Sequence, residues 1–370
     1  MSSLWFSKQM IKNKPKKIEN IYIKDNAKED IIETIEKTTN EEEKLEMEKL
    51  IVAIDAGKGY TKYFYAKEVE TRSKKDNSIV KKPKGFSGID KSTVVIGQEA
   101  VAGSTIYIND KPCNFNGTKK VVELEDKTKN NEEHKALMQK TLFEIAKKEK
   151  VNLFDVIMCT SLDQYKLEEN VEEMQKEMNI GTFNIKDDAE EMSITVEKVI
   201  IEPESIVSTI YAKTVLKDVL AVLVDIGTLN VGVVPLNMGR LNKEAISAPR
   251  IGYDHMINMF KEYTDSKGAN YSKEMLEVYV DKKQGTMEKL DEMFKSFFVN
   301  EYSKILKKEI DAKGFGEFAN LIFMGGTSIK CGELIKEAFS EYENVEIIED
   351  IYATVKGAYL KGKKDLEKLN

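Results

Sequence analysis

Residues 51–66 read "IVAIDAGKGYTKYFYA": an apolar run ends in Asp55, glycines follow, and a second β-prone run begins at Tyr60. An apolar run of this length predicts a buried strand, and the glycines after it predict a tight turn. The second run then predicts a strand that returns beside the first. Because glycine-rich backbone leaves its N–H groups open to phosphate oxygens, the turn is a candidate phosphate site.

The same arrangement occurs a second time in "AVLVDIGTLNVGVVPL", residues 221–236, where the apolar run ends in Asp225. A third apolar run, "LIFMGG" at 321–326, ends in two glycines. Each run reads as a buried strand that delivers Asp or Gly to a turn. Two copies of one strand–turn–strand unit indicate a duplicated lobe.

The better-known phosphate loops do not fit these turns. The sequence contains no G-x-x-x-x-G-K-[ST], and Lys62 stands where the dinucleotide fingerprint requires its third glycine. "GFGEFA" at 314–319 has a matching spacing, but it precedes an expected strand instead of following one. What remains is a pair of turns, each with an aspartate, which suits a triphosphate and Mg²⁺ held between two lobes.

Helices and strands alternate around the turns, as in α/β folds. We expect strands in 154–162 and 194–205 and a charged, irregular stretch at 67–133. The expected helices, read from amphipathic patterns, are 133–150, 163–178, 253–263, 272–282, 287–310 and 352–369.

Composition limits the function classes. The chain has 370 residues, 41% hydrophobic and 33% charged, which predicts a soluble protein of two domains. Its net charge of −7 argues against direct binding to nucleic acid. Cys113, Cys159 and Cys331 form no CxxC pair, and His134 and His255 are too few for a His-based metal site. The cysteine pattern indicates no disulfide framework, which suits a reducing cytoplasm. No 18-residue apolar run exists, so no membrane span is expected.

Residues 1–49 differ from the rest, and we interpret them as an appended N-terminal segment. "MSSLWFSKQMIKNKPKK" places an apolar cluster around Trp5 and Phe6 among lysines, and the following residues are rich in Glu and Lys. The cluster leaves three alternatives open: contact with a lipid interface, filament packing, or no ordered structure. A membrane is not the expected partner, because the apolar stretch is short.

Three segments, in this order, resemble the motifs of the actin-like ATPases, which include actin, the heat-shock chaperone ATPase, sugar kinases and bacterial filament proteins. "DAGKGYTK" (55–62) is similar to the phosphate-1 motif, "DIGTLN" (225–230) to phosphate-2, and "MGGTS" (324–328) to the adenosine motif. Within this superfamily the chain resembles the ParM-type plasmid-segregation actins through "CTSLDQYKLEEN" (159–170), "IIEPESIVSTIYA" (200–212) and "YATVKGAYL" (352–360). Residues 1–49 have no counterpart there.

The resemblance implies an α/β, actin-like (ribonuclease-H-like, duplicated) two-lobe fold with the nucleotide in the interlobe cleft. Lobe I would comprise residues 50–220 together with the C-terminal helix 351–370, and lobe II would comprise 221–350.

The resemblance also implies roles for single residues. Asp55 would orient Mg²⁺ through water, and Asp225 would face the metal and the γ-phosphate from the other lobe. Thr61 and Lys62 would face the phosphates, with Lys62 neutralising β-phosphate charge. Glu204 would polarise the attacking water; otherwise it is a helix-start glutamate favoured by the helix dipole. Asp225 and Glu204 are the catalytic candidates. Further nucleotide contacts would come from Gly57, Lys58, Gly59, Thr61, Gly227, Thr228, Asn230, Gly325, Gly326 and Thr327. Lys58 stands where a small Ser is frequent, so contact with phosphate and exposure to solvent both remain open.

The expected function is a filament-forming ATPase that binds ATP or GTP with Mg²⁺ and assembles with itself into a polar filament. A ParM-type protein would move plasmid DNA through a ParR-type adaptor, without touching nucleic acid itself. One alternative is a small-molecule kinase of the same superfamily, which needs an Asp beside the acceptor hydroxyl, and no separate motif indicates one. Another alternative is a membrane-associated cytoskeletal actin homologue.

Overall fold

Two β-sheets carry the described part of the chain, which in this computed structural model is residues 48–72, 79–99, 105–115, 129–213, 220–238, 240–241, 243–282 and 288–369. These ranges fall within one unit, Glu48–Asn370. The expected appended segment, including Trp5 and Phe6, lies outside the described residues up to position 47.

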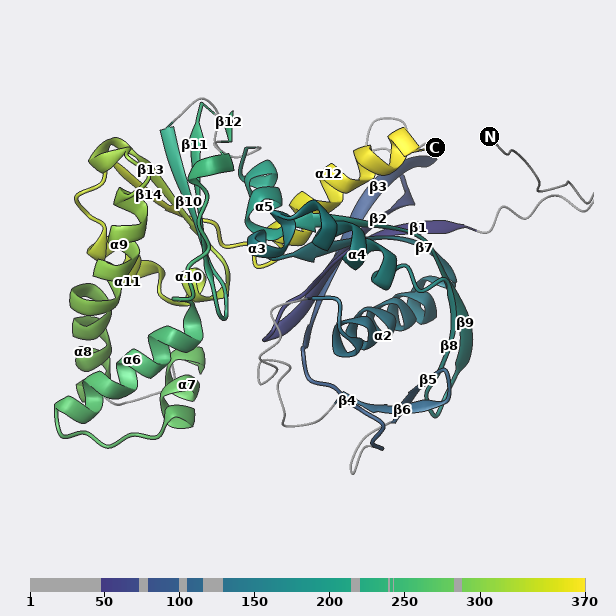
Figure 1. Cartoon of the computed structure of the whole chain (residues 1–370), viewed down its shortest axis with the longest axis horizontal. Coiled ribbons are helices and arrows are strands. Elements are labelled where there is room, and N and C mark those ends of the chain that lie inside the picture. Colours follow the sequence, from purple (N-terminus) through teal and green to yellow (C-terminus); the bar gives the residue numbers. More distant parts are fainter. Residues whose placement is uncertain are drawn as a thin grey trace, which may run out of the picture. The chain divides into compact units, whose positions relative to one another are not determined.

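The first sheet has nine strands in the order β3-β2-β1-β7-β9-β8-β5-β6-β4 (Figure 1). Strand β1 pairs antiparallel with β2 and parallel with β7, which in turn pairs parallel with β9. Both β1 and β7 are nearly continuous apolar runs because helices cover the centre of the sheet. The strands are β1 (Lys49–Ala56), β2 (Tyr60–Arg72), β3 (Ile79–Lys91), β4 (Val95–Ile96), β5 (Ile106–Ile108), β6 (Lys111–Asn114), β7 (Leu153–Thr160), β8 (Thr182–Lys186) and β9 (Glu191–Pro203).

The first strand of the second sheet is paired in the same way as the first strand of the first sheet. Its order is β12-β11-β10-β13-β14, with β10 antiparallel to β11 and parallel to β13. The strands are β10 (Leu220–Ile226), β11 (Val231–Asn237), β12 (Arg240–Leu241), β13 (Asn320–Met324) and β14 (Asn344–Ile347). The two predicted strand–turn–strand units are therefore confirmed as hairpins β1–β2 and β10–β11.

Helices cover both sheets. Figure 1 shows the first sheet curving around α2 (Glu132–Glu149), which buries Leu137, Leu142 and Phe143 in the core of that sheet. The helices packed on or near the second sheet are α6 (Tyr253–Ser266), α7 (Lys273–Lys282), α8 (Glu288–Phe297), α9 (Ser303–Asp311), α10 (Gly326–Lys330) and α11 (Gly332–Ala338). A π-helical turn, Phe298–Tyr302, joins α8 to α9, so the amphipathic pattern predicted over 287–310 is nearly unbroken.

Two helices pack against each other where the chain passes between the sheets. Helix α5 (Glu204–Lys213) follows the last strand of the first sheet, and α12 (Ala353–Leu369) follows the last strand of the second. Ser208 and Thr354 share a buried hydrogen bond of 3.0 Å across this contact. Lys361 on α12 donates to both oxygens of Glu202, at 2.6 and 2.7 Å, and so ties α12 to β9.

Two expectations about secondary structure were wrong. The stretch 67–133, expected to be irregular, contains the second half of β2 and strands β3 to β6. Strand β3 was not predicted because it lies at the edge of the sheet and is mostly exposed. Lysines therefore interrupt the apolar pattern that would have indicated a strand. The helix expected over 163–178 is two helices, α3 (Leu162–Tyr165) and α4 (Glu168–Met178), because Leu167 between them is extended.

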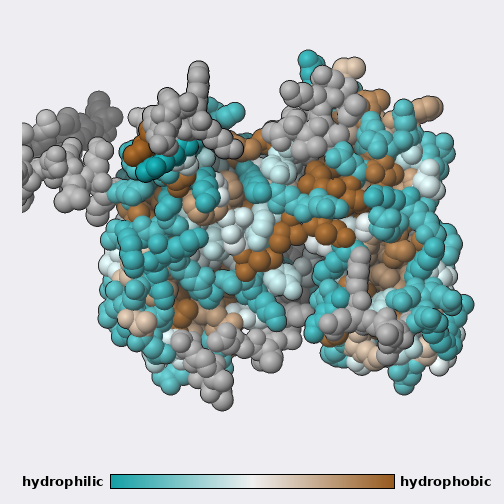
Figure 2. Space-filling model, turned by 180° about the vertical axis from the view of Figure 1, so that it is seen from behind, coloured by the Kyte–Doolittle hydropathy of each residue, from teal (hydrophilic) through white to brown (hydrophobic). Residues whose placement is uncertain are grey.

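The surface of the described residues is mainly polar. Figure 2 shows one face on which hydrophilic residues predominate and hydrophobic side chains gather near the middle. Large apolar side chains that are individually well exposed include Leu167, Met238 and Phe318. Within the described ranges, no helix combines the length and the apolar composition that crossing a bilayer requires.

Candidate functional site

The two hairpin turns lie against each other. Asp55 and Asp225 stand near the carboxyl ends of β1 and β10, directly before the turns. A Cβ atom built on Gly59 in the first turn would lie 2.9 Å from Thr228 Oγ1 in the second. The fold therefore brings together the two turns that the sequence predicted to act jointly.

Lys62 lies close enough to both Asp55 and Asp225 to interact with each carboxylate electrostatically. It is the cross-strand partner of Asp55 in the β1–β2 ladder, and directly opposed side chains lie on the same face of a sheet. Burial, the largest influence, raises the pKa of Asp225 to about 6, while the charge of Lys62 acts in the opposite direction and that of Asp55 adds to the increase. A carboxyl group with such a pKa gains from any nearby cation that favours its ionised form.

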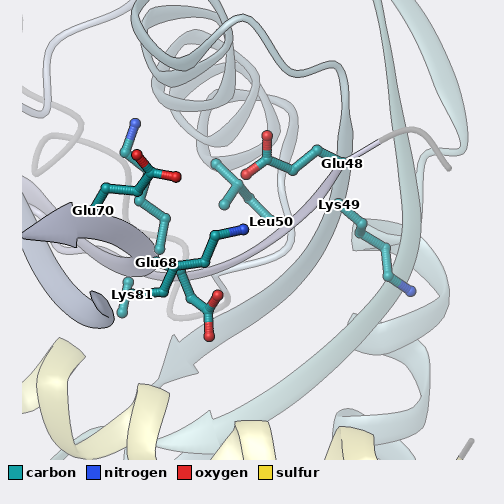
Figure 3. A pocket seen from close by; sticks show the side chains of 8 residues that line it. Glu48, Lys49, Leu50, Glu68, Glu70 and Lys81 are labelled. Atoms are coloured by element: carbon teal, nitrogen blue, oxygen red, sulfur yellow. The ribbon is translucent and has the colours of Figure 1, made fainter. Parts of the chain in front are cut away.

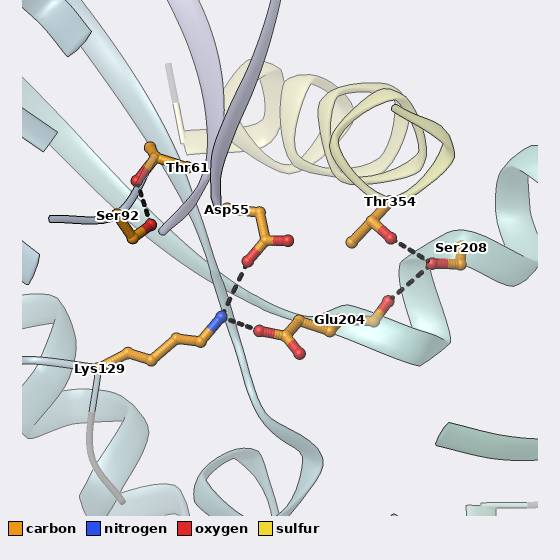
Figure 4. Close-up of polar contacts among 7 residues, drawn as sticks. All are labelled: Asp55, Thr61, Ser92, Lys129, Glu204, Ser208 and Thr354. Carbon is orange, nitrogen blue, oxygen red and sulfur yellow. Dashed lines mark hydrogen bonds and ion pairs between the residues drawn. The ribbon is translucent and has the colours of Figure 1, made fainter. Parts of the chain in front are cut away.

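A third lysine, which the sequence reasoning missed, lies between two predicted site residues. Lys129 Nζ donates to Asp55 Oδ1 at 2.8 Å and forms an ion pair with Glu204 Oε1 (Figure 4). The Lys129 side chain is only 8% exposed. No motif surrounds Lys129; the signal that could have found it is the need of two clustered carboxylates for a counter-charge.

Glu204 is held at the junction of β9 and α5. Strand β9 ends at Pro203, Glu204 opens the helix, and the following Ser205 is buried. Thr160, at the end of β7, is in register with Pro203. Its Oγ1 atom is buried and has no hydrogen-bond partner among the described residues. An unsatisfied buried hydroxyl at the strand end paired with the residue before Glu204 was not anticipated from sequence.

The second turn is fixed by the start of α6. Three consecutive N–H groups, from Gly252, Tyr253 and Asp254, donate to carbonyl oxygens of the turn at 2.9 Å each. These acceptors are Leu229, Gly227 and Thr228, respectively. Asn230, the last predicted contact in this turn, has a buried Oδ1 with no partner among the described residues. The N–H groups at the start of α6 thus hold the turn by its carbonyl oxygens.

The Gly-Gly pair after β13 lies beside Asp225. Gly325 has φ of 91°, and a Cβ there would lie 2.8 Å from Asp225 Oδ1. Glycine is therefore required at this position by the protein itself. A Cβ at Gly326 would meet nothing within 4 Å, and Thr327 is 5% exposed at the start of α10.

The remaining predicted residues belong to the first turn. Gly57, Lys58 and Gly59 are all partly exposed. Thr61 is 1% exposed, and its hydroxyl shares a hydrogen bond of 2.9 Å with Ser92 Oγ, so it supports the turn from within (Figure 4). Ser92 N–H also donates to the Gly59 carbonyl at 3.1 Å.

No protein-family model matches the chain, and no curated protein matches it in sequence. Solved structures do match. A 15-stranded ParM filament from Clostridium botulinum aligns with a TM-score of 0.61 at 17% identity, covering 86% of this chain and 100% of that one. The fold is actin-like.

Two further structures share the actin-like fold. The archaeal actin homologue Ta0583 has a TM-score of 0.62 at 14% identity, with 85% of this chain and 99% of that chain covered. The filament structure of AlfA from the B. subtilis plasmid pLS32 has a TM-score of 0.53 at 15% identity, with 84% and 98% covered. At these identities the similarity extends to the fold, and the chemistry has to be argued from the site.

The donor set at the two turns suits Mg²⁺ that arrives with a nucleotide. Among the residues that the structure describes, no three His, Cys, Asp or Glu side chains are grouped to hold a metal by themselves. Mg²⁺ in nucleotide enzymes needs only one or two carboxylates, because phosphates and waters complete its shell. Asp55 and Asp225 supply such carboxylates, and the charge of Asp55 raises the pKa of Asp225.

A separate hollow lies at the other end of β1. It is lined by Glu48, Lys49, Leu50, Ala66, Lys67, Glu68, Glu70 and Lys81 (Figure 3). Lys49 and Asp55 are six residues apart on an extended strand, which separates them by about 20 Å. Three glutamates and three lysines line this hollow, and it contains none of the glycine turns predicted to hold phosphate.

Proposed function

We propose that this protein is a Mg²⁺-dependent nucleoside triphosphatase whose nucleotide state controls its assembly into polar filaments. The observation that carries the proposal is the apposition of two Asp-bearing hairpin turns beside Glu204. The AlfA filament structure bound to AMPPNP and the Ta0583 structure in complex with ADP support nucleotide binding by this fold. ATP is the proposed nucleotide, and GTP is the alternative that the experiment must also test.

In this proposal each residue has one task. Asp55 and Asp225 would hold the metal ion, whose chemistry is to bridge phosphate oxygens and neutralise their charge. Lys62 would add a positive charge beside the phosphates, and the backbone of both turns would cradle them. Gly325 and Gly326 would border the nucleoside. Glu204 would orient the attacking water as a general base.

The cargo proposed for the filament is plasmid DNA, reached through a ParR-type adaptor. Support comes from the matching structures, since one is a ParM filament and another is AlfA from a plasmid. The net charge of −7 disfavours binding of the chain itself to the phosphate backbone, so an adaptor would supply the DNA contact.

The experiment is a comparison of assembly with and without nucleotide. The purified chain at tens of micromolar should pellet and form filaments visible by electron microscopy in Mg-ATP or Mg-GTP, and should release phosphate without any added acceptor. Asp225→Ala should lose turnover and remain folded. Phosphate transfer only when a sugar is added would favour the kinase alternative, and failure to pellet with any triphosphate would contradict the filament proposal.

A further inference from the structure

Lys129 bonds directly to two predicted functional carboxylates. Its ammonium is 2.8 Å from Asp55 Oδ1 and is also paired with Glu204 Oε1. The three side chains come from different places in the chain: the end of β1, the segment before α2, and the first residue of α5. Figure 4 shows the ammonium lying between the two carboxylates.

The cluster is poor in water. The exposed fractions of the Lys129, Asp55 and Glu204 side chains are 8%, 13% and 28%. Two carboxylates this close in a partly desolvated place repel each other, and a compact ammonium between them removes that repulsion. Removing one partner from such a cluster leaves uncompensated charge, which is costly.

A divalent ion at Asp55 would have to share the carboxylate with Lys129, whose ammonium bonds Asp55 Oδ1 at 2.8 Å. The ion would bring its charge next to that ammonium, and like charges at short range repel strongly when water is largely excluded. Binding of the ion and the Lys129–Asp55 contact therefore oppose each other.

We propose that Lys129 is a built-in competitor of Mg²⁺: it neutralises Asp55 and Glu204 when no metal is bound, and the incoming divalent cation displaces it from Asp55. This inference rests on the proposed function for the identity of the ion. It adds a positioning residue, Lys129, which keeps the site assembled before the nucleotide arrives. It also predicts that the lysine sets the threshold of metal concentration at which the site is occupied.

The test uses the full-length protein and Mn²⁺ as a paramagnetic probe, without nucleotide. Lys129→Met removes the competitor and leaves both carboxylates, so Mn²⁺ should bind about tenfold tighter or more, as measured by electron paramagnetic resonance. Lys129→Arg keeps the charge and should stay near wild type. The matched control is Lys140→Met, because Lys140 also pairs with two carboxylates, Asp90 at 2.9 Å and Glu144 at 2.6 Å, outside the site.

A second measurement, the affinity for ADP without metal, should change in the direction opposite to the affinity for Mn²⁺. With EDTA present, ADP should bind Lys129→Met about tenfold more weakly or worse, because the unneutralised carboxylates repel its phosphates. Local collapse of the site would weaken both Mn²⁺ and ADP, so tighter Mn²⁺ with weaker metal-free ADP identifies the competitor. Unchanged or weaker Mn²⁺ binding in a variant with a normal melting temperature would overturn the inference. If the wild type binds no nucleotide, the proposed function fails, while the Mn²⁺ comparison still tests Lys129.

Discussion

Gly232 and Ser205 lie in direct contact: a Cβ atom built on Gly232 would be 1.9 Å from Ser205 Oγ. Gly232 is the cross-strand partner of Asp225, just as Lys62 is the cross-strand partner of Asp55. The two hairpins are therefore similar in backbone and different in chemistry. The first offers a cation beside its aspartate, and the second offers room for the start of α5, the helix that carries Glu204.

Substituting Gly232→Ala should disturb this junction. The added methyl must displace Ser205, and overpacking of this kind usually lowers the free energy of unfolding by about 1–3 kcal/mol. Because Glu204 precedes Ser205, phosphate release should fall more than nucleotide affinity. Gly332→Ala is the control, since its Cβ would only reach van der Waals contact with Ile347, at 3.7 Å. Equal behaviour of the two variants in urea unfolding would contradict the proposed steric conflict.

Substituting Glu204→Gln should separate holding the nucleotide from cleaving it. The amide cannot accept a proton from water, so hydrolysis should fall by about 10²-fold or more, the usual effect of losing a positioned general base. Affinity should change little, and filaments should form but persist. Phosphate release and filament lifetime would be measured on the same sample. Wild-type hydrolysis would reduce Glu204 to a helix-start residue.

Substituting Thr160→Val should increase stability while it reduces activity. The buried hydroxyl has no hydrogen-bond partner among the described residues, and an isosteric apolar group removes a penalty of about 1–3 kcal/mol. Hydrolysis should also fall about tenfold, because the hydroxyl lies at the strand end next to the one that leads into Glu204 and is open to a ligand there. Thermal unfolding and phosphate release measure the two effects. A variant with lower stability and normal hydrolysis would assign Thr160 a purely structural role.

Asp350 should make the fold sensitive to acid. Burial is the largest influence and raises the pKa of Asp350, but hydrogen bonds from Lys356, Tyr211 and the Tyr352 N–H together outweigh it, so that the pKa is lowered. The stabilisation is present above the unfolded-state pKa of about 4 and is lost as the pH falls through the folded-state value.

The measurement for Asp350 is urea unfolding at a series of pH values. Asp350→Asn should be less stable than wild type at pH 7 by about 1 kcal/mol, the usual net value of such hydrogen bonds. That difference should shrink below about pH 4. Asp188→Asn removes an exposed carboxylate and is the control. A difference that stays constant down to acid pH would show that ionisation of Asp350 is not involved.

Removal of residues 1–47 should leave nucleotide binding intact. Both hairpins, Glu204 and Lys129 lie within the unit that begins at Glu48, and β1 begins at Lys49. Calorimetric titration with Mg-ADP would compare the truncated and full-length proteins. A folded truncation that no longer binds would place part of the segment at the site. Sedimentation with liposomes would separately test the Trp5–Phe6 cluster as a lipid contact.

The parts of the fold that could be predicted are those with a local pattern. Strands β1 and β10 are buried on both faces, so each appears in the sequence as an unbroken apolar run before a glycine turn. Strand β3 has no such pattern, because its side chains are mostly exposed. It is a strand because it pairs with β2, and its own amino-acid composition does not indicate one.

The candidate site likewise has features that could be predicted from a local sequence pattern and features that could not. That the turns beside Asp55 and Asp225 lie together could be predicted, because each aspartate stands at the end of its own strand within one short motif. Lys129 could not, because its contact with Asp55 joins residues 74 positions apart and no spacing rule connects them. The role of Gly232 was also hidden, since the residue that requires a glycine there is Ser205, on another element.

The outer edge of the first sheet has a consequence for self-assembly. Among the described strands, β3 pairs with β2 alone and forms an edge 13 residues long; such an edge can template amyloid-like growth by capturing a strand from another molecule. Pro83 cannot donate a hydrogen bond to a new strand, and Lys81, Lys82 and Lys84 around it would face like charges on an identical edge. The reversible polymerisation proposed above would require that irreversible sheet extension be blocked, and Pro83 and its neighbouring lysines place that block within the strand itself.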